Sequence, residues 1–392
     1  MKKTLSITEV IASVSVNAGG TGMFMSDICH YLPNTSATFS LLTATESGVE
    51  DLPIDQRVEV YKLKTTARKS LLGGVSRPGT AEGLTSLAKQ NGIDLVHLHG
   101  LWLDICRDSA TWARKQKTCF VISPHGMLEP WALTHKKLKK DFALWLYQRR
   151  DLESARGFHA CSHLEAESIR RLGLKQPIAV IPNGVQLPEA DVFEGVKVEK
   201  LEGNQKTALF LSRINPKKGL PMLLDAWKRI APVGWRLVIA GNDDANHLPV
   251  VERKIRELGL SDVVEIAGSL LGSDKEQAYL NADIFVLPSY SENFGIVVTE
   301  ALGYQVPVLT TTGCPWQELE SERCGWWVDP SPAGIEQGLK AAFAASDQER
   351  QDMGVRGRHL VEQKYLWPAI AENMTIFYQW LLEGGTKPDF VV

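Results

Sequence analysis

The sequence predicts an α/β protein that is built from two parallel-sheet domains in series. Short apolar runs alternate with longer segments of helical periodicity, which is typical of stacked strand-helix units. The alternation stops once, in a stretch rich in Pro, Glu, Lys and Gly at Gln186–Asn204, and then resumes. The chain has 392 residues, of which 44% are hydrophobic and 23% charged, so it is long enough for two such domains.

The first series begins with a strand within residues 4–16 that runs into a glycine turn, Ala18–Gly22. Glu9 and scattered hydroxyl residues interrupt this stretch, which argues against a secretory leader. The later strands of the series are expected at Leu95–Leu98, Cys119–Ser123, Phe158–Cys161 and Ile178–Ile181.

The second series supplies six further strands, most of them followed by a helical segment. They are expected at Leu209–Leu211, Arg236–Ala240, Val263–Ala267, Ile284–Leu287, Val308–Thr310 and Gly325–Val328. An aromatic amphipathic helix, Trp367–Leu382, comes too late to cap the second sheet and is expected to cross back to the first domain. We therefore expect a first domain at 1–190, a second domain at 191–370, and a returning helix at 371–392, with a cleft between the two domains.

Composition excludes several classes of protein. Lys plus Arg number 43 against 46 Asp plus Glu, so no basic field favours a nucleic-acid partner. No run of about 18 apolar residues predicts a membrane span. The six cysteines lack C-x-x-C spacing, which favours reduced thiols and a cytoplasmic protein. The glycine turn is not a full G-x-G-x-x-G, so a nicotinamide or flavin site is weakly supported and no cofactor is expected.

The most informative motif is the segment 289–303, which follows the strand Ile284–Leu287. A strand, a polar turn and a helix start form an anion site, because the first helical N–H groups are unpaired and the helix dipole favours negative charge. Glu292 and Glu300 would lie roughly 12 Å apart if the segment were helical throughout, which suits a sugar at one end of a diphosphate and a ribose at the other. The alternative is that Glu292 is an ordinary first-turn residue and Glu300 a solvated one.

Two cations follow the strand Leu209–Leu211. Arg213 and Lys218 at the carboxyl end of a strand could clamp a diphosphate without a metal ion. The alternative is a basic surface turn that Pro and Gly terminate. Both motifs lie at strand ends of one predicted sheet, where ligands of parallel sheets bind, and this shared position strengthens both.

Three histidines end two strands of the first series. Strand alternation points His97 and His99 to the same face, where a metal pair is conceivable. No third ligand follows at a recognisable metal spacing, so hydrogen-bonded histidines are favoured and no metal is expected. His125 is the better functional candidate, because Pro124 and Gly126 shape a turn around it.

These residues together resemble the retaining glycosyltransferases of family 4, which have the GT-B fold of two facing Rossmann-like domains with an interdomain cleft. The resemblance covers nearly the whole chain. The motifs that carry it are Gly19-Gly20, His125 in Ser-Pro-His-Gly, Ala160-Cys161-Ser162 before Glu165, Ile181–Val185, Ser212-Arg213 to Lys218-Gly219, and Glu292 with seven residues to Glu300. The sequence of Ser123–Leu133 is similar to the corresponding segment of bacterial family members that assemble exopolysaccharide or lipopolysaccharide.

The resemblance implies a hexosyltransferase that uses a UDP- or GDP-sugar and a saccharide or lipid-linked saccharide acceptor. It also implies that the domain 1–190 binds the acceptor and the domain 191–370 binds the nucleotide-sugar donor. Arg213 and Lys218 would bind the donor diphosphate, and Glu300 would accept hydrogen bonds from the ribose hydroxyls. Glu292 would accept hydrogen bonds from the sugar hydroxyls, and His125 would lie beside the donor sugar. The remaining donor contacts would come from the glycine loop and from backbone groups, at Gly20, Phe294, Gly295, Ile296 and Val297. The leaving phosphate itself would take the acceptor proton in a same-face substitution.

Rival functions remain open. A GT-B nucleotide-sugar epimerase would use the same donor site, and a non-catalytic saccharide-binding protein could keep the fold without the charged clamp. A dinucleotide-dependent oxidoreductase would need a bound nicotinamide or flavin.

A basic amphipathic segment, 135–150, raises the question of membrane contact. It carries lysines beside Leu138, Phe142, Trp145 and Leu146, so its apolar face could lie on an anionic membrane surface. The alternative is that this face packs on the first sheet and the lysines are solvated. The first interpretation predicts peripheral contact with the inner face of the cytoplasmic membrane.

Overall fold

The computed structural model describes residues 4–16, 18–45, 48–64, 66–69, 75–76, 79–134, 137–189 and 205–392. The described chain forms two compact units. Unit 1 is Met1–Gly184 with Trp367–Val392, and unit 2 is Val185–Leu366. The predicted linker Gln186–Asn204 lies outside the described residues beyond Glu189.

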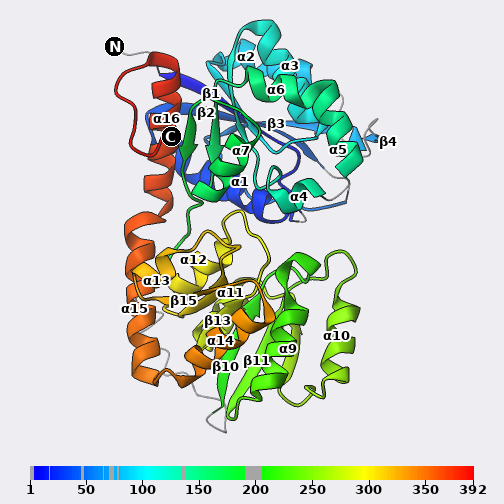
Figure 1. Ribbon diagram of the computed structural model, residues 1–392. Helices are drawn as coiled ribbons and strands as arrows, with labels where there is room; N and C mark the ends of the chain where they lie inside the picture. The colour runs from blue at the N-terminus through cyan, green and yellow to red at the C-terminus, as the bar shows by residue number, and fades with distance from the viewer. Residues whose placement is uncertain are drawn as a thin grey trace. The chain divides into compact units, whose positions relative to one another are not determined.

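Unit 1 contains a seven-stranded parallel sheet in the order β3-β2-β1-β6-β7-β8-β9. Figure 1 labels β1, β2 and β3 of this sheet. Its strands are β1 (Leu5–Ile11), β2 (Ala37–Thr45), β3 (Glu59–Lys64), β6 (Leu95–His99), β7 (Cys119–Ser123), β8 (Gly157–Ala160) and β9 (Ile178–Val180). The short strands β4 (Thr66–Lys69) and β5 (Val75–Ser76) form a separate antiparallel pair. The strands expected in this unit are confirmed, whereas the sequence analysis missed β2 and β3.

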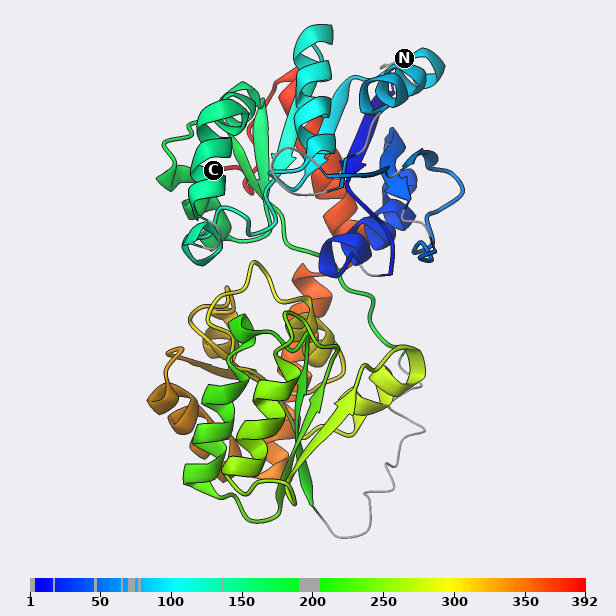
Figure 2. The same ribbon diagram turned by 90° about the vertical axis from the view of Figure 1, so that its right-hand side faces the viewer.

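Helices cover both faces of this sheet. One face packs against α1 (Gly20–Tyr31) and α16 (Trp367–Glu383), whose apolar side chains share a core with β1 and β2. Figure 2 shows α16, in red, running along the sheet of unit 1. The helices of the other face are α2 (Thr80–Asn91), α3 (Asp104–Gln116), α6 (Arg149–Ser154) and α7 (His163–Arg171).

The chain between β7 and β8 also forms short helices. They are α4 (Pro130–Thr134), α5 (Lys137–Ala143) and a π-helical turn, η2 (Leu144–Gln148), which leads directly into α6. His135 and Lys136 of the predicted amphipathic segment lie outside the described residues. None of the described helices is long and apolar enough to cross a bilayer.

Unit 2 contains a six-stranded parallel sheet in the order β12-β11-β10-β13-β14-β15. Its strands are β10 (Lys206–Leu211), β11 (Trp235–Ala240), β12 (Val264–Gly268), β13 (Ile284–Leu287), β14 (Val308–Thr311) and β15 (Gly325–Val328). Its helices are α9 (Leu220–Ile230), α10 (Leu248–Glu257), α11 (Gly272–Leu280), α12 (Ile296–Gly303), α13 (Glu318–Ser321), α14 (Pro332–Ala344) and α15 (Asp347–Lys364). All six predicted strands are confirmed within one to three residues at each end.

Strand order determines where a ligand can bind in each unit. In unit 2 the order reverses between β10 and β13, and in unit 1 it reverses between β1 and β6. Loops that leave neighbouring strands in opposite directions open a crevice at the carboxyl edge of a parallel sheet. The predicted basic and acidic motifs of unit 2 follow β10 and β13, and the predicted histidines of unit 1 lie on or beside β6.

Candidate functional site

The loops after β10 and β13 pack directly against each other in unit 2. Gly219 has a positive φ of 69°, and a Cβ there would overlap the carbonyl oxygen of Pro288. The N–H of Tyr290 donates to the carbonyl of Lys217 at 2.9 Å. Only glycine allows this close approach of the two loops, so the basic and acidic motifs are held side by side.

Lys218 and Glu292 form an ion pair at this crevice. Lys218 Nζ lies 2.6 Å from Glu292 Oε1, and each side chain is only 11% exposed. The hydroxyl of Ser289 donates to the same oxygen at 2.6 Å. Burial alone would raise the pKa of Glu292, but the charges of the two neighbouring lysines and these hydrogen bonds outweigh burial and lower the pKa. Glu292 is therefore an ionised carboxylate in a fixed position.

Glu292 does not lie in a helix. Helix α12 begins at Ile296, and the N–H of Glu292 donates to the carbonyl of Gly313 in a loop. The assumption that residues 292–300 are helical throughout was wrong, because Gly295 adopts a left-handed φ of 86° and ends the loop. The alternative role of Glu292 as a first-turn residue is therefore excluded.

Arg213 also pairs with a carboxylate. Its Nη1 lies 2.6 Å from Oδ2 of Asp244, which follows β11, and Asn215 Nδ2 donates to the same oxygen at 3.2 Å. Sequence reasoning missed Asp244, because it lies 31 residues from Arg213 and joins the site only through the pairing of β10 with β11. A diphosphate that binds Arg213 would have to share the guanidinium group with Asp244 or displace Asp244 from it.

The start of α12 presents backbone N–H groups rather than side chains. Gly295 precedes the helix and no side chain caps it. The ring of Phe294 is buried against Trp316, and the Phe294 carbonyl accepts from Trp316 Nε1 at 2.6 Å. Phe294 can therefore contribute only backbone groups to a ligand, as the sequence analysis expects. The first-turn N–H groups at Ile296 and Val297 lie where a helix favours an anion.

Glu300 is held by two residues of α11. Lys275 Nζ lies 2.6 Å from Glu300 Oε1, and the hydroxyl of the buried Tyr279 donates to Oε2 at 2.7 Å. Burial and the nearby charge of Glu300 raise the pKa of Tyr279, so it remains a hydrogen-bond donor. Glu300 is thus not a freely solvated helix residue. Sequence reasoning missed Lys275 and Tyr279, which no local pattern connects to Glu300.

Asn293 adds a buried acceptor beside Glu292. No group in the described part of the chain hydrogen-bonds to its Oδ1. A buried carbonyl oxygen without a partner costs free energy unless a ligand or water supplies a donor. Asn293 is therefore a further candidate contact that sequence reasoning did not single out.

In unit 1, His125 lies in a strained turn after β7. His125 and Gly126 both have positive φ, 51° and 75°. The buried carboxylate of Glu165 accepts from the N–H of Gly126 at 2.6 Å and from that of Cys161 at 2.8 Å, which ties the turn to the start of α7. A left-handed histidine is uncommon and costs free energy, so His125 is held in a strained conformation by these anchors and is a candidate site residue.

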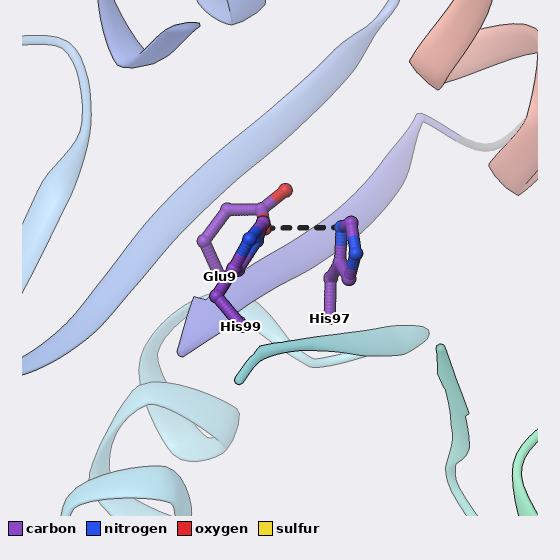
Figure 3. A group of neighbouring side chains, drawn as sticks. All are labelled: Glu9, His97 and His99. Carbon is purple, nitrogen blue, oxygen red and sulfur yellow. Dashed lines mark hydrogen bonds and ion pairs between the residues drawn. The ribbon is translucent and has the colours of Figure 1, made fainter. Parts of the chain in front are cut away.

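His125 joins a buried polar cluster. Its Nε2 lies 2.9 Å from Nδ1 of His99, whose Nε2 lies 2.7 Å from Glu9 Oε2. His97 Nδ1 lies 3.3 Å from the same carboxylate, and Figure 3 shows Glu9 beside both rings. Sequence reasoning missed Glu9 as a site residue, although a carboxylate inside an apolar strand was a signal.

Glu9, His97 and His99 are the one group among the described residues whose ligand atoms lie close enough together to hold a metal ion. Ligands of a tetrahedral zinc ion at 2.0–2.2 Å lie about 3.4 Å from one another. The contact of 2.7 Å between His99 and Glu9 has instead the length of a hydrogen bond. The cluster therefore fits a hydrogen-bonded network better than a metal centre.

Helix α1 begins at Gly20. Gly19, which precedes it, has a φ of 67°, and no side chain caps the start of the helix. A Cβ on either glycine would meet nothing within 4 Å. The space beside this helix start is open, as a loop that approaches a ligand requires.

Two protein families match this chain. Residues 19–184 match the glycosyl transferase 4-like domain, and residues 192–360 match the glycosyl transferases group 1. An uncharacterized glycosyltransferase of Methanocaldococcus jannaschii is 29% identical over 222 residues, 53% of this chain and 55% of the relative. The aligned segments span about half the length of the curated relatives that this chain matches.

Solved structures resemble the whole chain. A sucrose-phosphate synthase from Thermosynechococcus elongatus has a TM-score of 0.77 at 19% identity, over 97% of this chain and all of that one. HepE of Anabaena, in complex with UDP and glucose, has a TM-score of 0.71 at 17% identity, over 95% and 99%. At this identity the likeness shows the fold, and it confirms the GT-B class with two Rossmann-like parallel-sheet units.

Proposed function

This chain belongs to the group 1 glycosyl transferases, and on that premise we propose that it moves a hexosyl group from a nucleotide-diphosphate sugar to a saccharide acceptor with retention of configuration. The observation that carries this proposal is the ion pair between Lys218 and Glu292 at the switch point of unit 2. One ionised carboxylate and one ammonium at a single crevice suit a ligand with hydroxyls beside a diphosphate.

Each charged group of the crevice is proposed to contact one part of the donor. Lys218 and Arg213 balance the diphosphate charge in place of a divalent cation, with the N–H groups at the start of α12 as further donors. Glu292 accepts from the sugar hydroxyls, and Glu300, oriented by Lys275 and Tyr279, accepts from the ribose. UDP- and GDP-sugars both meet these requirements, and UDP with glucose is the ligand pair named for the HepE structure.

The reaction needs no enzyme nucleophile. The bond from the sugar C1 to the diphosphate oxygen breaks, and the acceptor oxygen bonds to C1 from the same face. The acceptor proton passes to the leaving phosphate, so atoms and charge balance. His125 contacts the donor sugar and orients it, and Gly20 lets the α1 loop approach the substrates.

Transfer itself is the test of this function. Incubated with UDP- and GDP-hexoses and a panel of saccharide acceptors, the protein is expected to release the nucleoside diphosphate in step with a new glycoside. Release should persist in a chelator, because Lys218 and Arg213 supply the charge. Interconversion of the donor with its epimer, without release, would instead identify an epimerase.

The acceptor is proposed to be a saccharide, free or polyprenyl-linked, in bacterial cell-surface polysaccharide synthesis. The similarity of residues 123–133 to enzymes of exopolysaccharide or lipopolysaccharide assembly supports this proposal. A lipid-linked acceptor would place the reaction at the inner face of the cytoplasmic membrane.

The helical segment formed by α5 and η2 has a surface that could contact that membrane. Leu138, Phe142, Trp145 and Leu146 share one face, and all four are exposed, Leu138 at 85% and Trp145 at 78%. The alternative that this face packs on the sheet is therefore wrong. Instead Ala143 is buried and Leu144 packs on the core.

Lysines accompany this apolar face. Lys137 and Lys139 are exposed on the same helix, although Lys137 pairs with Asp141 at 2.6 Å. Apolar side chains with lysines beside them favour an anionic lipid surface over a neutral one.

The double variant Leu138→Ser, Trp145→Ser should lose at least tenfold in affinity for phosphatidylglycerol vesicles, because each side chain contributes about 1.5–3 kcal/mol on burial. Co-sedimentation measures the loss, and phosphatidylcholine vesicles should bind more weakly than anionic ones. Val233→Ser, at a residue of unit 2 that is 96% exposed, is the control and should bind as the unmodified protein does. Equal binding by the double variant would refute the membrane surface.

A further inference from the structure

The hydrogen bonds of His125 continue into the core of unit 1. His125 Nε2 lies 2.9 Å from His99 Nδ1, and His99 Nε2 lies 2.7 Å from Glu9 Oε2. The other oxygen of Glu9 accepts from the hydroxyl of Tyr378, on α16, at 3.0 Å. Glu9, His99 and Tyr378 are buried, whereas His125 is partly exposed at the surface end of the chain of bonds.

The positions of the protons follow from the order of these groups. The pKa of Glu9 is lowered, because the neighbouring histidines outweigh its burial, so Glu9 is a carboxylate and can only accept. Burial and the charge of His97 lower the pKa of His99 to about 4, so the ring is neutral at pH 7. A neutral His99 that donates from Nε2 has a lone pair on Nδ1 and must accept there.

The same reasoning extends to His125. Since His99 Nδ1 accepts, the proton of the bond between the two rings belongs to His125 Nε2. Burial and the other histidines lower the pKa of His125, so this ring is also neutral and its Nδ1 carries a lone pair. No described group hydrogen-bonds to that nitrogen.

The far side of the cluster keeps Glu9 in place. His97 Nδ1 contacts the Tyr378 hydroxyl at 2.7 Å, and His97 Nε2 contacts Ser123 Oγ at 2.7 Å. Ser123 in turn contacts His159 Nδ1 at 2.7 Å, and His159 Nε2 donates to the Ile181 carbonyl at 2.8 Å. His159 Nδ1 therefore accepts from Ser123, and Ser123 accepts from His97 Nε2, so the one proton of Tyr378 can bond to Glu9 Oε1 or to His97 Nδ1. These contacts surround the carboxylate of Glu9 and limit its rotation.

We propose that Glu9 is a positioning residue which, acting through His99, fixes the proton of His125 on Nε2, so that Nδ1 accepts a hydrogen bond from a hydroxyl of the donor sugar. The inference rests on the proposed function for the sugar, but the position of the proton is a property of the unliganded protein. The arrangement resembles in logic a carboxylate that sets the tautomer of a catalytic histidine.

Glu9→Gln tests the relay because it removes the charge that makes position 9 accept only. The Tyr378 proton can bond to the amide oxygen or to His97 Nδ1, so the amide can present either its NH₂ group or its oxygen to His99. Where the NH₂ group faces His99, that ring must accept at Nε2 and donate from Nδ1 to His125. Both rings should therefore lose the exclusive Nε2–H tautomer and populate Nδ1–H as well.

Nitrogen-15 NMR of histidine-labelled protein reads the tautomers directly. The unmodified protein should show only Nε2–H at His99 and His125, and Glu9→Gln should show an Nδ1–H population at both. The matched control Tyr378→Phe retains Oε2 and should keep the original tautomers. A proton on His125 Nδ1 in the unmodified protein would overturn the proposal, whether or not any variant folds, and so would unchanged rings in Glu9→Gln or a bound metal ion.

Kinetics separate this inference from the proposed function. Glu9→Gln should lower kcat in proportion to its Nδ1–H population, with little change in the donor KM, because in that tautomer the wrong nitrogen faces the sugar. Tyr378→Phe should retain most of the activity. Switched tautomers with unchanged kcat would refute the positioning role, whereas full activity of His125→Ala would refute the proposed role of His125 itself.

Discussion

Glu292→Ala is expected to reduce the turnover of glycosyl transfer by about 10² to 10³, the effect of removing one preorganised charged group from an active site. The carboxylate is ionised, held by Lys218 and Ser289, and located where the sugar would lie. Its loss removes both the acceptor for sugar hydroxyls and the negative charge that stabilises a cationic sugar in the transition state. The steady-state rate with saturating donor measures the effect.

The fold should survive this change, because the pair lies in loops at the edge of the sheet and not in the core of unit 2. Glu257→Ala removes an exposed carboxylate from α10 and is the matched control, with turnover expected near that of the unmodified protein. A Glu292→Ala variant that is folded and fully active would mean that Glu292 does not contact the reacting sugar.

Acidification should destabilise unit 1 strongly between pH 6.5 and 4. Burial lowers the pKa of His99 and of His159 to about 4, and it also lowers the pKa of His97 and His125. These rings are neutral in the folded unit but take up protons once unfolded, so the unfolded state gains stability as the pH falls below about 6.5. Each such histidine contributes a slope of about 1.4 kcal/mol per pH unit in this window.

Hydrogen exchange in peptides from β6 and β7, measured in urea at pH 7, 6 and 5, reports the free energy of unfolding of unit 1. The free energy should fall at each step, and His159→Gln should flatten the curve by about one proton. His359→Gln changes an exposed ring of α15 and should leave the slope unaltered. A free energy of unfolding that is constant from pH 7 to 5 would contradict neutral buried histidines.

Local patterns predict most of the fold. Every strand of unit 2 and five strands of unit 1, namely β1 and β6 to β9, appear where the sequence predicts them. Most of these predictions rest on apolar runs bounded by turns, because parallel strands that are buried on both faces need such runs. Strands β2 and β3 escape this pattern. Strand β2 contains Thr38, Ser40 and Thr43 among its apolar residues, and β3 is half-exposed at the sheet edge.

Local patterns likewise predict only some residues of the candidate site. Residues beside a strand end, such as Lys218, Glu292 and His125, are visible as motifs. Their partners are not, because pairing across the sheet brings them in from distant segments: Glu9 lies 90 residues before His99. The exposed face of α5 and η2 shows a further limit, since an amphipathic pattern identifies an apolar face but not what covers it.

The central claim is that the crevice of unit 2 activates a nucleotide-diphosphate sugar for transfer with retention. Proton NMR of the reaction with an α-linked hexosyl donor and a saccharide acceptor, in the presence of a chelator, tests it most directly. The account predicts that free nucleoside diphosphate and an α-linked product appear together, and that both disappear with Glu292→Ala. A β-linked product, a donor epimerised without release of nucleotide, or a reaction that the chelator stops would contradict it.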